Sequence, residues 1–186
     1  MKVILFISLF FLVSCNDYQK LMKPAIEAKL NDKNTKPVFD GEVEPELPDF
    51  DKIVQDDVGV DQNKNGIRDD VDIWINRTGK NYNERMAMRQ FAHAIEKMII
   101  NCNLNINNDL QVKTDNWLAS TQCLRFITKS DEVDQYAEGY PVYNLEKVIY
   151  GNFIKRCWKF LNKNSPSFSL KNGYKPYLNC NFEVKK

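Results

Sequence analysis

Oxygen-bearing side chains alternate along the segment DQNKNGIRDDVD, which runs from Asp61 to Asp72. In a twelve-residue loop, oxygens at positions 1, 3, 5, 7, 9 and 12 can surround a Ca²⁺ ion, and a glycine at position 6 permits the sharp turn. The residues in those places are Asp61, Asn63, Asn65, the backbone carbonyl of Ile67, Asp69 and Asp72, with Gly66 at position 6. The spacing therefore predicts a calcium site.

Only three of the predicted ligands are carboxylates, because asparagines stand at positions 3 and 5. By ligand charge, the calcium affinity should be weak, on the order of 10⁻⁵ to 10⁻³ M. We expect a structural role, in which Ca²⁺ fixes a following short helix with Val71, Trp74 and Ile75 on one face. The alternative is a metal-free, Asx-rich turn that caps the helix starting near Asp70.

The loop resembles known calcium loops in two details. An aliphatic residue at position 7 and an aspartate at position 12 make it similar to dockerin and thrombospondin type 3 loops, whereas an EF-hand loop ends in glutamate. With its flanks GVD and DDV, the motif is also similar to one in uncharacterised bacterial lipoproteins. This second resemblance covers only the loop and its flanks, and it implies no activity.

The first fifteen residues indicate export and lipid anchoring. Lys2 precedes an apolar run from Val3 to Val13, which is too short to span a bilayer and is typical of a secretory signal peptide. The run ends in LVSC, which resembles the bacterial lipobox, and this resemblance implies removal of residues 1–14 and acylation of Cys15, with palmitate among the acyl chains. We expect a bacterial cell-envelope protein, anchored in the outer membrane and facing the periplasm or the surface. The alternative is a plain signal peptide or anchor helix with an incidental cysteine.

The cysteine count agrees with export. Five cysteines leave one unpaired in an oxidising compartment, and lipidation would use Cys15. The other four can form two disulfides in three alternative ways, unless they are reduced and buried. We favour Cys102–Cys123 and Cys157–Cys180, because the second pair would attach a weakly packed C-terminal arm to a helix. The first pair requires residues 103–113 to fold back as a loop.

Charge argues against a polyanionic partner. Without Lys2 the chain has 25 basic and 25 acidic residues. A neutral exported chain is a poor ligand for nucleic acid, so we expect no nucleic acid partner. Residues 40–80 nevertheless carry twelve acids and five bases, whereas residues 141–186 carry nine bases and two acids. The basic end is therefore expected to face an acidic protein surface, lipid headgroups or the acidic segment.

Composition divides the mature chain into two parts. Residues 15–51 contain four prolines and few aromatic residues, which predicts a lipidated, flexible tether. Residues 52–186 are expected to form a calcium-loop-containing domain with helices over 82–101, 115–127 and 144–161. A hairpin is expected around Asn172-Gly173. The predicted fold is mainly α: a small disulfide-stapled helical domain with a short C-terminal extended or hairpin element.

No catalytic motif is evident in the sequence. His93 is the only histidine, and with Glu96 it would supply only two metal ligands, so a helix-face histidine is the favoured interpretation. We therefore expect a non-enzymatic binding module, held at the membrane by acyl chains, with an envelope protein as a candidate partner. The alternative is a small envelope hydrolase whose active site cannot be recognised from sequence.

Overall fold

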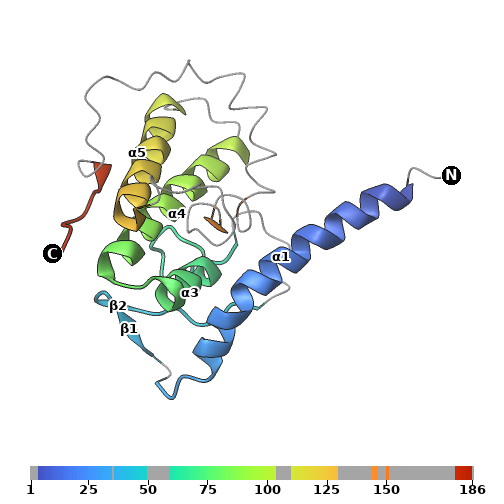
Figure 1. Cartoon of the computed structure of the whole chain (residues 1–186), viewed down its shortest axis with the longest axis horizontal. Helices are drawn as coiled ribbons and strands as arrows, with labels where there is room; N and C mark the ends of the chain where they lie inside the picture. Colours follow the sequence, from blue (N-terminus) through green and yellow to red (C-terminus); the bar gives the residue numbers. More distant parts are fainter. Residues whose placement is uncertain are drawn as a thin grey trace.

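The computed structural model describes residues 4–34, 36–49, 59–103, 110–129, 144, 145, 150 and 179–185. For residues 4–16 and 103–115 it describes only the backbone. Its elements are α1 (Ile4–Leu30), β1 (Val38–Phe39), β2 (Glu42–Val43), α3 (Asp69–Thr78), α4 (Tyr82–Asn103) and α5 (Leu110–Thr128). Figure 1 shows α3, α4 and α5 grouped together, with α1 running along one side and its N-terminal half projecting away. Within the described ranges, no helix has both the length and the apolar character needed to cross a bilayer.

The expected flexible tether packs against the fold over its described part, which corrects that prediction. Helix α1 continues through Pro24, and Met22 and Ala25 are each only 1% exposed. Proline within a helix loses one backbone hydrogen bond, but Pro24 is exposed, and burial of the opposite apolar face favours the helix. Tyr18, Leu21 and Ile26 pack beside this core. Whether residues 1–14 are removed stays a prediction.

A hairpin that we did not predict follows α1. Strand β1 pairs antiparallel with β2, and Val38 lies opposite Val43. The turn residues Asp40 and Gly41 have φ values of 56° and 94°. Two successive positive φ angles are typical of the tight hairpin turn that Asp-Gly favours. The signal was therefore present in a segment whose composition suggested a tether.

The short helix predicted after the loop and the helix predicted over 82–101 are both present, as α3 and α4. In α3, Val71, Trp74 and Ile75 are all buried. At the start of α4, Asn81 Oδ1 accepts the backbone N–H of Glu84 at 3.0 Å, as an N-cap does. The apolar residues of α4 that recur at three- and four-residue steps are buried at Met88, Phe91, Ala92, Ile95, Met98 and Ile99, and Cys102 is half-buried.

The disulfide prediction is wrong, because Cys123 on α5 is bonded to Cys180. This bond excludes both favoured pairs, Cys102–Cys123 and Cys157–Cys180. The physical reason lies in α5, which begins at Leu110 and not at the expected Asp115. Thirteen residues of helix place Cys123 about 20 Å from the start of α5, so the segment cannot fold back toward the end of α4 as a loop.

The architecture itself is confirmed as mainly helical and disulfide-stapled. One core joins α1, α3, α4 and α5, and Leu145 and Tyr150 are fully buried in it. The remainder of the helix expected over 144–161, which includes Cys157, lies outside the described residues. The hairpin expected around Asn172-Gly173 also lies outside them. Residues 179–185 are described, and they lie along α4 through hydrogen bonds from Asn83 and Gln90.

Candidate functional site

The predicted calcium loop is a tight turn that leads into α3. Gly66 has a φ of 81°, and a Cβ atom added there would lie 2.7 Å from the imidazole of His93 on α4. Glycine is therefore required at position 6 for its backbone conformation and for the close approach of α4. His93 is half-buried over this glycine, and burial lowers its imidazole pKa. The position of His93 agrees with the expected helix-face histidine.

The oxygens of the predicted ligands are turned into the loop. The carboxylate of Asp61 accepts the backbone N–H groups of Asn65 at 3.2 Å and of Gly66 at 2.9 Å. Asn63 Oδ1 accepts from Asn65 N at 3.2 Å, and Asn65 Oδ1 accepts from Ile67 N at 2.9 Å. Amide and carboxylate oxygens have further lone pairs, so these contacts still leave acceptor capacity for a cation.

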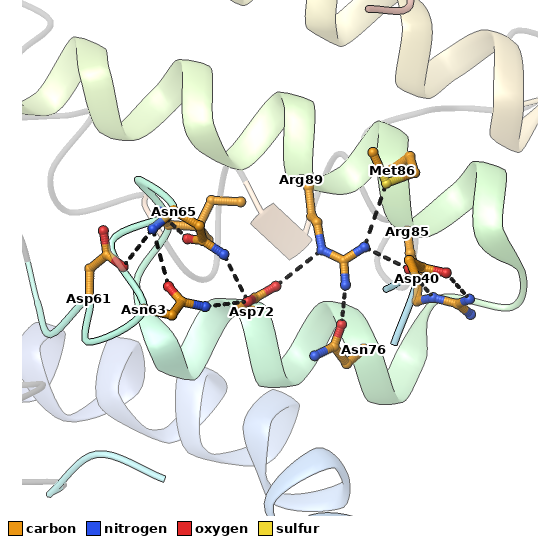
Figure 2. Close-up of polar contacts among 10 residues, drawn as sticks. Asp40, Asp61, Asn63, Asn65, Asp72, Asn76, Arg85, Met86 and Arg89 are labelled. Atoms are coloured by element: carbon orange, nitrogen blue, oxygen red, sulfur yellow. Dashed lines mark hydrogen bonds and ion pairs between the residues drawn. The ribbon is translucent and has the colours of Figure 1, made fainter. Parts of the chain in front are cut away.

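Asp72, the predicted ligand at position 12, accepts hydrogen bonds from side chains, whereas the oxygens above accept from backbone N–H groups (Figure 2). Its Oδ2 accepts amide N–H groups from Asn65 at 3.0 Å and from Asn63 at 3.4 Å. Its Oδ1 accepts from Arg89 Nε at 3.2 Å. Among the described residues, no group of three or more histidines, cysteines, aspartates or glutamates is gathered as a metal site. The amides of the two asparagines thus occupy the space beside Asp72.

Asp69, the predicted ligand at position 9, lies in a negative environment. Its carboxylate is fully buried and accepts the N–H of Gln62 at 3.1 and 3.2 Å. Burial, together with the charges of Asp61, Asp70 and Asp72, raises the pKa of Asp69 to about 6. A cation in the loop would offset this repulsion, so the donor chemistry fits a hard divalent ion.

A buried polar cluster joins the loop to three helices. The guanidinium of Arg68 makes a bidentate pair with Asp70, at 3.1 and 2.9 Å, and the hydroxyl of Tyr18 on α1 also donates to Asp70. Glu96 on α4 accepts the backbone N–H of Arg68 at 3.0 Å and the hydroxyl of Tyr150. The carboxylate of Asp70 is therefore bound by both Arg68 and Tyr18.

Burial determines the protonation of the cluster. It raises the pKa of Glu96 to about 7, and it raises the pKa of Tyr18 and Tyr150 well above the usual range. Shifted carboxyl groups are frequent at active sites. Glu96 is only 6% exposed and Tyr150 is fully buried, so their contact lies in the interior of the described part of the fold.

The hairpin is fixed to α3 and α4 by arginines. Arg77 bonds Glu44 Oε1 at 2.9 Å and Asp32 Oδ2 at 2.9 Å. Arg85 and Arg89 share Asp40, with Nε of Arg85 at 2.8 Å and NH1 of Arg89 at 2.7 Å from Oδ2. These arginine–carboxylate pairs are not predictable from the sequence, because partners more than thirty residues apart leave no local pattern.

The remaining predicted sites are only partly visible. Cys15 lies within the backbone of α1, and its side chain is outside the described part, as is Cys157. Comparison of the chain with protein-family models, with curated proteins and with solved structures finds no match.

Proposed function

We propose that this protein is a lipid-anchored, non-enzymatic interaction module of the bacterial cell envelope, with a structural calcium site in residues 61–72. The observation that carries the interaction role is a pair of exposed apolar residues that lie opposite each other on the hairpin, Val38 and Val43, here called the hairpin patch. These side chains are 61% and 53% exposed. Exposed apolar patches of this kind are typical of protein-binding surfaces.

The hairpin patch is held in place before any partner binds. Lys29 Nζ lies 3.0 Å from Glu44 Oε2, which brings the end of α1 next to β2. The guanidinium of Arg77 lies over the ring of Phe39, and the distance from Arg77 Cζ to the ring centroid is 5.1 Å. A surface that is already ordered loses little conformational entropy on binding, which favours recognition.

Crosslinking in intact cells, followed by purification of the acylated protein, tests the interaction role. The double substitution Val38→Ser/Val43→Ser should remove the crosslinked partner. Val184→Ser changes an exposed apolar residue elsewhere and should keep it. A partner that is still crosslinked to the hairpin variant at the original yield would refute the role of the patch.

The anchor is supported by the lipobox-like LVSC that ends at Cys15. Cys15→Ala should leave an unprocessed or soluble species, because the mature chain would lack acyl chains. Fractionation of the variant with membranes after leader cleavage would contradict lipid anchoring.

The calcium site is supported by the inward-turned oxygens and by the raised pKa of Asp69. Binding at a weak site in millimolar Ca²⁺ should stabilise the fold by on the order of 1–3 kcal/mol, so EDTA should lower the Tm. Asp61→Ala and Asp69→Ala should abolish that difference. Gln62→Ala is the matched control, because its exposed side chain is outside the ligand register and its backbone N–H is retained.

Asp70 is not a suitable control, since its carboxylate is buried against Arg68. Equal melting curves in EDTA and in Ca²⁺, with no calcium bound in a titration, would leave the loop as a metal-free helix cap.

A further inference from the structure

The helix that follows the candidate acylation site is attached to the folded domain along its length. Tyr18 donates its hydroxyl hydrogen bond to Asp70 at the start of α3. Met22 and Ala25 are buried in the common core, and Lys29 pairs with Glu44. Figure 1 shows this part of α1 beside α3. From Tyr18 onward, α1 therefore forms part of the domain.

Only three residue steps separate Cys15 from Tyr18. In a helix they span about 4.5 Å, and even a fully extended chain spans no more than about 11 Å. The free tether expected from composition, residues 15–51, would have a root-mean-square length of about 33 Å. The two arrangements differ in how far the domain can move from its anchor.

We propose that the acylated N-terminus holds the folded domain directly against lipid headgroups, with the Tyr18 end of α1 at the bilayer surface. The proposal rests on the proposed acylation of Cys15. The surface that this end of the domain contacts is the lipid bilayer itself. The chain between Cys15 and Tyr18 is too short for another layer of protein to lie between them. The domain is thus mounted on the membrane by a docked helix, without a flexible spacer.

Energy transfer to labelled lipids tests this arrangement. The acylated protein is purified from its own membranes and reconstituted into phosphatidylethanolamine–phosphatidylglycerol vesicles that contain dansyl-labelled phosphatidylethanolamine. Transfer from the protein's tryptophans should be high. Insertion of about twenty Gly/Ser residues between Cys15 and Tyr18 leaves the core unchanged and should reduce the transfer efficiency at least twofold, because a flexible linker lets the domain move away from the bilayer.

Two substitutions on α1 provide a matched pair. Met22→Asp places a charge in the core contact of α1 and should reduce transfer in the same way, whereas Glu27→Gln, on the exposed side, should not. The inserted linker keeps the test valid if the Met22 variant fails to fold. Equal transfer with and without the linker, at either a high or a low level, would overturn the proposal.

Mass spectrometry separates this proposal from the one on which it rests. A chain without acyl groups on Cys15 refutes lipid anchoring itself. An acylated chain whose transfer is unaffected by the linker refutes only the direct contact with the bilayer.

Discussion

The Cys123–Cys180 disulfide should be a major source of stability. The cross-link closes a loop with a sequence separation of 57 residues. The loop-entropy relation gives about 4 kcal/mol for a loop of this length, through restriction of the unfolded chain. Urea unfolding of Cys123→Ala/Cys180→Ala should therefore show a decrease of about 4 kcal/mol in the free energy of unfolding.

A matched control separates the cross-link from the hydrogen bonds of the same segment. Asn179 Nδ2 donates to Gln122 Oε1 at 2.7 Å, one residue from each cysteine. Asn179→Ala removes this contact and keeps the disulfide, so it should cost about 1 kcal/mol. If the double cysteine variant lost no more than the Asn179 variant, the entropic reasoning would be refuted.

Peptide mapping tests the pairing itself. Only one of the three ways to pair the four cysteines contains Cys123–Cys180, and its other bond is Cys102–Cys157. Both bonds are expected in non-reduced digests of the exported protein. Recovery of Cys102–Cys123 instead would contradict the fold.

Three further predictions concern buried and strained positions. Arg68→Met and Asp70→Asn should each destabilise the fold by about 3–5 kcal/mol in urea, and the double variant by less than their sum, because each single change removes one charge of the buried Arg68–Asp70 ion pair. The carboxyl of Glu96 has a pKa of about 7 in the fold against an ordinary 4.5, so the folded state binds its proton more tightly and stability should fall as pH rises between these values. Glu96→Gln should remove that fall and stabilise the protein at about pH 8 by about 1–3 kcal/mol; an unchanged pH profile would contradict the assignment. Gly66→Ala should lower the Tm more than Gly41→Ala, because both require positive φ but only Gly66 has an imidazole packed over it.

Local patterns predicted the elements whose signals lie within one turn or one loop. The helix predicted over 82–101 begins at Tyr82, and the N-cap contact that marks its start joins Asn81 and Glu84, which are only three residues apart. The alternating oxygens of residues 61–72 predicted a loop whose side chains turn inward, and Asp61 and Asn63 are oriented in this way. The contact of Asp72 with Arg89 joins the loop to α4 across 17 residues, a separation that no local pattern contains.

The prediction of a flexible tether was wrong for α1, because a few buried residues determine the structure of a segment whose overall composition is polar. Residues 15–51 contain four prolines and few aromatic residues, and this composition is typical of a tether. Yet Met22 and Ala25 occur at a helical spacing, and each is buried. The carboxylates of Asp40 and Glu44, in the same segment, are the partners of arginines on α3 and α4. A charged segment is ordered when its counter-charges lie in the domain.

Arg89 shows why the loop and the hairpin should be regarded as one structure (Figure 2). Its guanidinium contacts Asp72 of the loop register at 3.2 Å and Asp40 of the hairpin turn at 2.7 Å, and it also donates to Asn76. A guanidinium has five N–H donors in one rigid plane, so it can hold both carboxylates in a fixed geometry, whereas a lysine ammonium could not. Arg89 therefore connects Asp72, at the end of the loop register, directly to the turn between the strands that carry Val38 and Val43.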